Sequence, residues 1–258
     1  MKIQSLPRRE WVVLLLLAVG ILFAQHGRPL YAAQEDGAPL LTPADLFCSF
    51  LVMDMERLDL RITGAEAGIE RILLKENDRV YMNKGLESGL AEGQTFTILA
   101  PGPAFKPFGR LAFKRGWVRV VQVKDSRSTG EIVQACGEVR VGDFLVPLEE
   151  TESPVGKDLG YDVDPDNLKG MDGSFLFLQN DFAIIASGQW ALTDLGAERG
   201  MRVGDQVLIF REKKDTPPTA IGNAVVIDVQ NRTSTVKILS CRDAVIIGDR
   251  LRTRGPAD

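Results

Sequence analysis

The second half of this chain repeats the glycine and turn pattern of the first half. Three glycines stand four residues apart in each half, and residues 116–143 align without a gap onto residues 222–249. An Asn-Asp pair lies upstream in both halves, at 77–78 and 180–181. A repeat of this size predicts two copies of one structural module. The two glycine sets are Gly85, Gly89 and Gly93, and Gly196, Gly200 and Gly204.

Each half is also rich in short, β-branched segments that are separated by turn residues. The clearest are 117–123 and 224–229, and each precedes a four-residue turn and a returning β-branched segment. Such connections are typical of β-hairpins. We therefore expect an all-β fold in which two tandem, duplicated small β-barrel or sandwich modules follow an N-terminal signal peptide.

Composition shifts along the chain predict the domain boundaries. The segment 34–45 is polar and contains proline, which favours a flexible leader, and residues 149–173 are rich in Asp, Glu, Gly and Pro, which favours a linker. The expected parts are a signal peptide (1–33), a leader segment (34–61), β-module 1 (62–148), a linker (149–173) and β-module 2 (174–258).

The first residues indicate export. Lys2, Arg8 and Arg9 precede an apolar run over 11–24, and small residues follow at 32–33, which is the layout of a secretory signal peptide. At about 1.5 Å per residue the run spans roughly 21 Å, short of the ~30 Å hydrocarbon core. We expect a periplasmic protein with a mature N-terminus between residues 25 and 35. The alternative is an uncleaved anchor in the inner membrane through residues 11–24, which would be the only membrane contact.

Removal of the signal peptide would change the chemistry that the chain can perform. The segment holds four basic residues and one acidic residue, so the net charge of −4 becomes −7. An acidic chain without a basic block does not favour nucleic acid as a partner. The single histidine, His26, would leave as well, which excludes His-dependent triads and His zinc sites from the mature chain.

The sequence predicts neither a metal nor a cofactor. Asp162, Asp164 and Asp166 alternate like the start of a calcium loop, but Asn167 and Gly173 occupy the positions where such a loop needs Gly and Glu. We therefore interpret these aspartates as part of the linker.

The three cysteines leave several readings open. Cys48, Cys136 and Cys241 lack the close spacing of a zinc site or a redox pair. They can be three small buried side chains, one disulfide with an odd thiol, or a set that includes a reactive or metal-binding thiol. The sequence does not decide which two would pair.

The spacing of the glycines favours a structural role. Glu87 and Glu92 are incompatible with a membrane dimer face, and no Lys-Ser/Thr ending of a phosphate-binding loop is present. We expect each glycine to give a turn a positive φ, with Leu90 or Met201 filling the core between two turns. Two Gly-Asp pairs, in which the aspartate is expected to cap the turn, are Gly142-Asp143 and Gly248-Asp249.

This succession of strands, Asn-Asp, glycine triplet, valine-rich hairpin and Gly-Asp resembles a family of exported bacterial β-modules. It is similar to the C-terminal domain of flagellar assembly protein T, and to the tandem β-region that follows LysM repeats in many Gram-negative envelope proteins. The resemblance implies a scaffolding or assembly role in the envelope without catalysis. No LysM repeat precedes the modules, because residues 34–60 are too few and lack its pattern, so direct glycan binding is not implied.

We thus expect a non-enzymatic periplasmic scaffold or assembly protein, flagellar or of another envelope machine, whose partner is an envelope protein. Two alternatives stay open: a carbohydrate- or peptidoglycan-binding module, and a carboxylate-dependent envelope hydrolase. The sequence names neither the partner nor the oligomeric state.

The residues 101–109 are the predicted binding loop of module 1. Phe105 and Phe108 flank Lys106 in a proline-rich stretch between two strands, and loops of this kind carry recognition. Our hypothesis is that the two rings contact a protein partner and that Lys106 adds a charge at the rim. The alternative is that the rings fold back onto the protein.

Overall fold

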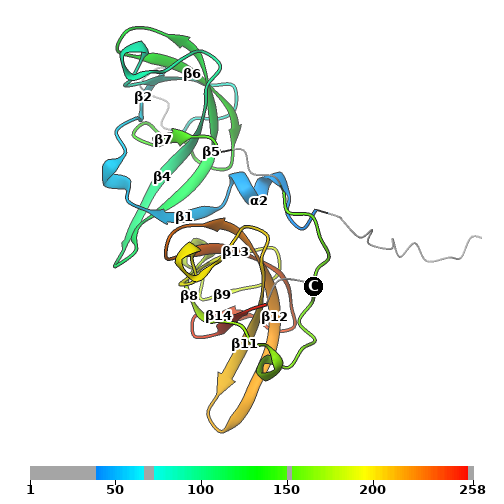
Figure 1. The fold of residues 1–258 in the computed structure, drawn as a ribbon. Coiled ribbons are helices and arrows are strands. Elements are labelled where there is room, and N and C mark those ends of the chain that lie inside the picture. The colour runs from blue at the N-terminus through cyan, green and yellow to red at the C-terminus, as the bar shows by residue number, and fades with distance from the viewer. Residues whose placement is uncertain (1–38, 67–72, 150–152, 255–258) are drawn as a thin grey trace, which may run out of the picture. The chain divides into compact units, whose positions relative to one another are not determined.

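The computed structural model describes residues 39–66, 73–149 and 153–254 (Figure 1). The predicted signal peptide lies outside these ranges. The described residues have an all-β fold, to which one short α-helix, α2 (Pro43–Phe47), and brief 3₁₀ turns are added. No helix within these ranges is long and apolar enough to cross a membrane.

Strands β2 to β7 form a sheet, here called module 1. Its strand order is β2-β3-β6-β5-β4-β7, and β1 pairs with β5 beside this path. A bridge between Arg61 and Phe144 links the β2 and β7 edges, and the Ile62 N–H donates to the Asp143 carbonyl at 2.9 Å. The strands are β1 (Phe50–Met53), β2 (Ile62–Ala65), β3 (Arg79–Met82), β4 (Thr95–Phe105), β5 (Gly109–Val123), β6 (Ser128–Ala135) and β7 (Phe144–Pro147).

The later strands form a closed barrel, here called module 2, with the order β10-β13-β12-β11-β15-β8. This order corresponds strand by strand to β3-β6-β5-β4-β7-β2 of module 1. A two-stranded sheet of β9 and β14 accompanies the barrel. The strands are β8 (Asp172–Leu178), β9 (Ile184–Ile185), β10 (Trp190–Thr193), β11 (Gln206–Lys213), β12 (Thr216–Val229), β13 (Ser234–Cys241), β14 (Val245–Ile246) and β15 (Arg250–Thr253).

The strand registers also correspond between the modules. Tyr81 lies opposite Thr129 in the β3–β6 pair, and Leu192 lies opposite Thr235 in the β10–β13 pair. The β5–β6 pair and the β12–β13 pair each contain two register shifts, at matching places. The residues of these strand pairs therefore have structural equivalents in the other module.

Alternating apolar residues build a separate core inside each module. In β3, for example, Val80 and Met82 are buried while Arg79 and Tyr81 are exposed. Full burial of an aliphatic side chain stabilises a fold by about 1.5–3 kcal/mol. The principal core residues are Ile62, Val80, Ile98, Val118 and Ile132 in module 1, and Phe175, Val207, Ile209, Val226, Val236 and Ile238 in module 2.

The segment that we expected to be a flexible leader is part of the fold from residue 39 onward. Leu41 and Leu46 are almost fully buried, at 2% and 5% exposure. Thr42 caps α2, and the chain then continues into β1. The apolar side chains of this segment find a packing surface on module 2, which explains the difference from the expectation.

The described part of the linker also lies against module 2. The side chain of Gln206 donates to the Lys157 carbonyl at 2.8 Å and accepts from the Leu159 N–H at 2.9 Å. The linker has few large apolar residues, so it is attached mainly through its backbone polar groups.

Candidate functional site

The glycine triplets build a turn of the same kind in both modules. Gly89 and Gly200 have φ values of 79° and 77°, and Gly93 and Gly204 have values of 87° and 94°. Leu90 and Met201, which follow the first of these turns, are buried. The four glycines thus hold left-handed conformations that L side chains rarely adopt.

The expectation of a positive φ is wrong for the first glycine of each triplet. Gly85 and Gly196 have φ values of −144° and −132°. A Cβ on Gly85 would lie 1.9 Å from the Lys124 carbonyl oxygen, and one on Gly196 would lie 2.5 Å from the backbone of Arg232. These two glycines allow the close approach of the neighbouring hairpin turn.

The aspartates of the two Gly-Asp pairs accept backbone hydrogen bonds. The Asp143 carboxylate accepts from the Arg140 N–H at 2.8 Å, and the Asp249 carboxylate accepts from the Ile246 N–H at 2.9 Å. Burial raises the pKa of Asp143. Asp249 also forms an ion pair, in which the Arg211 guanidinium donates to both carboxylate oxygens, at 2.7 and 2.9 Å. The preceding Gly142 and Gly248 have φ values of 102° and 109°.

The predicted binding loop is not a loop. Residues 101–109 continue β4 and β5 into a long hairpin, in which Phe105 pairs with Gly109 (Figure 1). The strands extend because register shifts accommodate the prolines along β4. Lys106 and Pro107, at the tip of the hairpin, are exposed, whereas Phe105 and Phe108 on either side of them are half-buried.

Both phenylalanines make contacts within the chain. The Phe105 ring meets the Phe177 ring edge-on, with centroids 6.4 Å apart. The guanidinium of Arg232 lies 4.8 Å from the centroid of Phe108. Both rings are half-buried against an apolar cluster that contains Phe50. The structure therefore favours the alternative reading, in which the rings fold back onto the protein, while the Lys106 side chain makes no hydrogen bond or ion pair among the described residues.

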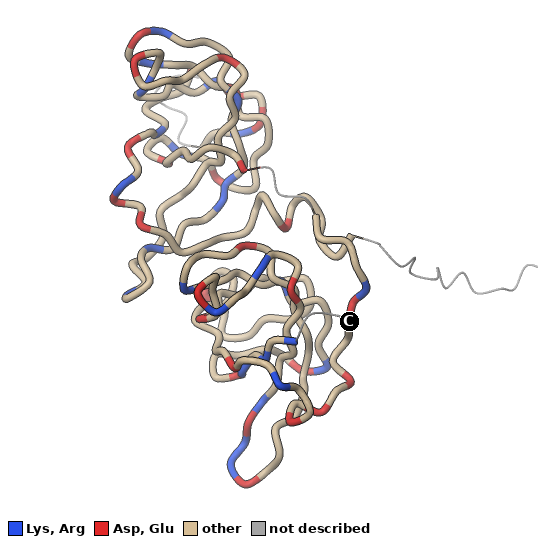
Figure 2. Tube along the Cα trace, in the orientation of Figure 1, with Lys and Arg blue, Asp and Glu red and all other residues tan. Residues whose placement is uncertain are grey.

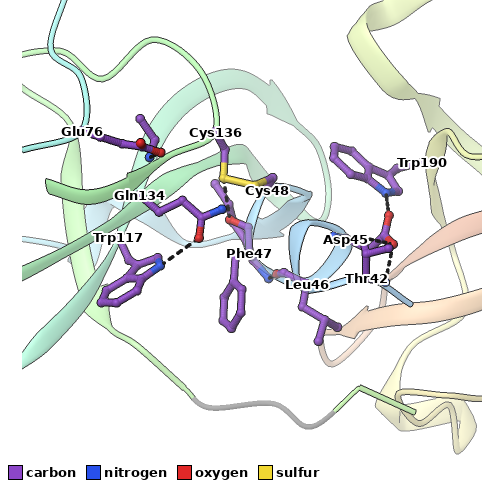
Figure 3. Close-up of a disulfide and its surroundings, with 12 residues drawn as sticks. Thr42, Asp45, Leu46, Phe47, Cys48, Glu76, Trp117, Gln134, Cys136 and Trp190 are labelled. Carbon is purple, nitrogen blue, oxygen red and sulfur yellow. Dashed lines mark hydrogen bonds between the residues drawn. A yellow bond between two sulfur atoms is a disulfide. The ribbon is translucent and has the colours of Figure 1, made fainter. Parts of the chain in front are cut away.

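One disulfide joins the segment before β1 to module 1. Cys48 and Cys136 are bonded, with Cα atoms 5.3 Å apart (Figure 3), and Cys241 is a free, half-buried thiol. This is the reading of one disulfide with an odd thiol. No three or more His, Cys, Asp or Glu residues in the described ranges are grouped to hold a metal ion. Asp164 caps a 3₁₀ turn instead, accepting from the Asp166 N–H at 3.0 Å.

The most extensive polar contact that the sequence did not predict involves Asp45 of α2. Its carboxylate accepts from the Lys237 ammonium at 2.6 Å. It also accepts from the Trp190 indole at 3.2 Å (Figure 3). The Thr42 N–H and hydroxyl also donate to it, at 2.8 and 2.7 Å. Burial alone would raise the pKa of Asp45, but the hydrogen bonds from Lys237 and Thr42 outweigh it, so the pKa lies below its ordinary value.

Residues 41–53, here called the docking segment, continue this contact along module 2. The Thr235 hydroxyl donates to the Phe50 carbonyl at 2.6 Å. The Phe50 ring meets the Phe177 ring edge-on, with centroids 5.4 Å apart, and Leu192 packs in the same cluster. Together these partners form the module 2 docking face: Phe177, Trp190, Leu192, Thr235 and Lys237.

A third contact links β5 of module 1 to β12 of module 2. The Lys114 ammonium donates to Asp228 at 2.8 Å and to the Leu46 carbonyl at 2.9 Å. Asp228 also accepts from Gln230 at 2.9 Å. A cavity of about 360 Å³ lies here, lined by two carboxylates, Asp228 and Glu149. Both oxygens of the Asp228 carboxylate are therefore engaged in this contact.

A short signal in the sequence could have identified the docking segment. Thr42 and Asp45 are three residues apart and Pro43 follows the threonine, which is the pattern of a capped helix start. Both hydrogen bonds of this capping box are formed. The pattern predicts the helix, but it does not indicate which surface the helix covers.

Comparisons of the chain with protein-family models, with curated proteins and with solved structures give no match.

Proposed function

We propose that this chain is an exported, non-enzymatic assembly or scaffold protein of the cell envelope, built from two duplicated β-modules whose outer faces bind polypeptide segments. The observation that carries the proposal is the module 2 docking face, because it already holds one such segment. Its Thr235 binds a backbone carbonyl, its Lys237 binds a carboxylate, and its apolar residues receive the Phe50 ring. Backbone hydrogen bonds and side-chain pockets are the two components of peptide-strand recognition.

The duplication is supported by the corresponding strand orders and registers of the two modules. Equal left-handed turns at Gly89 and Gly200 support it as well. A common ancestral module accounts for both facts, because unrelated barrels would not share bulges at matching places.

Export is supported by the disulfide between Cys48 and Cys136, since structural disulfides persist in oxidising compartments such as the periplasm. A protein partner, rather than nucleic acid, is supported by the distribution of charge. Figure 2 shows basic and acidic positions interspersed along the described chain, in a protein of net charge −4.

A scaffold role without catalysis is supported by the use of the buried acids. Asp45, Asp143 and Asp249 are each almost fully buried. All three accept backbone or cation hydrogen bonds that hold the fold together. These three carboxylates therefore have structural roles as hydrogen-bond acceptors.

The proposal is tested with the tagged full chain in its native host. We expect the chain in the periplasmic or envelope fraction, with a mature N-terminus between residues 25 and 35 by mass spectrometry. Cross-linking before lysis should capture the same envelope protein in repeated experiments. A chain that stays in the cytoplasm with residue 1 intact, or that hydrolyses envelope glycan after purification, would refute the proposal.

A further inference from the structure

The face of module 1 that is equivalent to the module 2 docking face is uncovered. Tyr81 is the structural equivalent of Leu192, since they lie opposite Thr129 and Thr235 in matching strand pairs. Tyr81 is 42% exposed, whereas Leu192 is 1% exposed. In module 2 the docking segment covers this position, and in module 1 no described residue does so.

The uncovered face carries a glycine where module 2 has a large ring, and it borders a cavity. Gly64 lies opposite Tyr81, where module 2 places Phe177 opposite Leu192. A cavity of about 500 Å³ lies beside Tyr81. The side chains around it, here called the Tyr81 pocket, include Glu66, Arg79, Tyr81, Gln122, Lys124, Arg127 and Thr129.

Several polar side chains that line the Tyr81 pocket have no partner among the described residues, although those of Asn83 and Ser128 are hydrogen-bonded. Among the described residues, the side chains of Tyr81, Gln122 and Thr129 make no hydrogen bond, and those of Lys124 and Arg127 make no ion pair. Arg79 has only a 3.8 Å approach to Glu66. Thr129 is the equivalent of Thr235, whose hydroxyl binds the Phe50 carbonyl in module 2. The Thr129 hydroxyl of module 1 can therefore donate a hydrogen bond to a backbone carbonyl of a bound segment.

The charge of the pocket differs from that of the whole protein. Three cations, Arg79, Lys124 and Arg127, line it with one carboxylate, Glu66, whereas the chain carries a net charge of −4. Charge-assisted hydrogen bonds from arginine to a carboxylate are short and roughly twice as strong as neutral ones. A ligand that carries carboxylates matches this lining.

We infer that the Tyr81 pocket binds an extended, acidic segment of a partner polypeptide. Thr129 donates to a backbone carbonyl of that segment, Tyr81 packs against one of its side chains, and Arg79 and Arg127 bind its carboxylates. The inference rests on the proposed function and gives it a site. A polypeptide is favoured over an anionic saccharide because the equivalent face of module 2 holds a polypeptide through the equivalent threonine.

The test uses the purified full chain and a phage library that displays random peptides of about twelve residues. We expect the recovered peptides to be rich in Asp and Glu. Their affinity should fall about tenfold or more in the double variant Arg79→Glu/Arg127→Glu, because two charge-assisted bonds are lost. The matched control Arg199→Glu/Arg202→Glu changes two exposed arginines of module 2 and should bind as the parent chain does. Thr129→Val should weaken binding severalfold without a change of charge.

The inference is overturned if the recovered peptides are not acidic, or if they bind the double variant as tightly as the parent. It is also overturned if polygalacturonate, an anionic polysaccharide, binds the parent chain and not the double variant while no acidic peptide does. Circular dichroism of each variant confirms its fold. If the double variant captures the cross-linked envelope partner as well as the parent chain does, the assignment of binding to the Tyr81 pocket is refuted and the proposed function stands. If no envelope partner is captured, the proposed function fails whatever the peptides do.

Discussion

Gly89 and Gly200 hold left-handed backbone conformations in open space, since no atom lies within 4 Å of the place where a Cβ would stand. We predict that Gly89→Val and Gly200→Val each lower the free energy of unfolding by about 1–3 kcal/mol, because a β-branched residue is strained at positive φ. Urea denaturation measures the effect. Gly89→Asn is the matched control and should cost less, since asparagine tolerates this conformation. An equal loss in both variants would contradict the assignment to backbone strain.

The carboxylate of Asp45 gives a pH-dependent contribution to stability. Its pKa is lowered in the folded protein from an ordinary value of 3.8, so the stabilisation is present above 3.8 and is lost as the pH falls through the lower, folded value. We predict that Asp45→Asn is less stable than the parent by about 1–3 kcal/mol at neutral pH. This gap should close below pH 3.8.

Denaturant unfolding over a pH series measures this gap. Glu56→Gln, at an exposed acid without a side-chain partner among the described residues, is the control and should show little difference at any pH. A gap for Asp45→Asn that persists in acid would show that packing, and not charge, is responsible.

Spacing in the sequence identified all six triplet glycines but could not separate their two purposes. A positive φ at Gly89 and a close backbone approach at Gly85 both require glycine, so the two positions look alike in the sequence. Only the position of the neighbouring hairpin, which the fold determines, distinguishes them.

Among the elements, the β4–β5 hairpin differs most from the expectation of a partner-binding loop, because the rings of Phe105 and Phe108 pack against other residues of the chain. We predict that Phe105→Ala/Phe108→Ala lowers the free energy of unfolding by about 2–4 kcal/mol, somewhat less than for fully buried rings. Thermal and urea denaturation measure the loss. Lys106→Ala, at the exposed tip between the rings, should leave stability unchanged. A double variant as stable as the parent would return the rings to the role of a partner-binding surface.

Elements were predictable from the sequence where their cause is local. The valine-rich hairpins and their turns follow from alternation and turn residues, and the structure has strands β5, β6, β12 and β13 there. The docking segment was not predictable in the same way. Its partners Thr235 and Lys237 lie 185 and 192 residues further along the chain, so no window of the sequence contains both sides of the contact.

At the scale of the whole molecule, the disulfide holds the middle of the docking segment, at Cys48, on module 1 across 88 residues. We predict that Cys48→Ser/Cys136→Ser lowers the free energy of unfolding by about 2–4 kcal/mol, since a long closed loop is opened in the unfolded chain. Cys241→Ser is the matched control and should cost much less. Thiol titration of the denatured parent should find one free thiol before reduction and three afterwards. Three thiols without reduction would contradict the disulfide.

The docking segment and its partners on module 2 lie far apart in the sequence, and this affects folding while the chain is being synthesised. Synthesis proceeds from the N-terminus, and domains tend to fold in that order. Phe50 can pair into module 1 early, where its ring meets Phe113, yet the side of the ring that meets Phe177 stays uncovered until β8 has been made. A chain that is cut short before Asp172 therefore exposes an apolar ring that the finished chain buries. Such an incomplete chain exposes apolar surface of the kind that chaperones and proteases recognise.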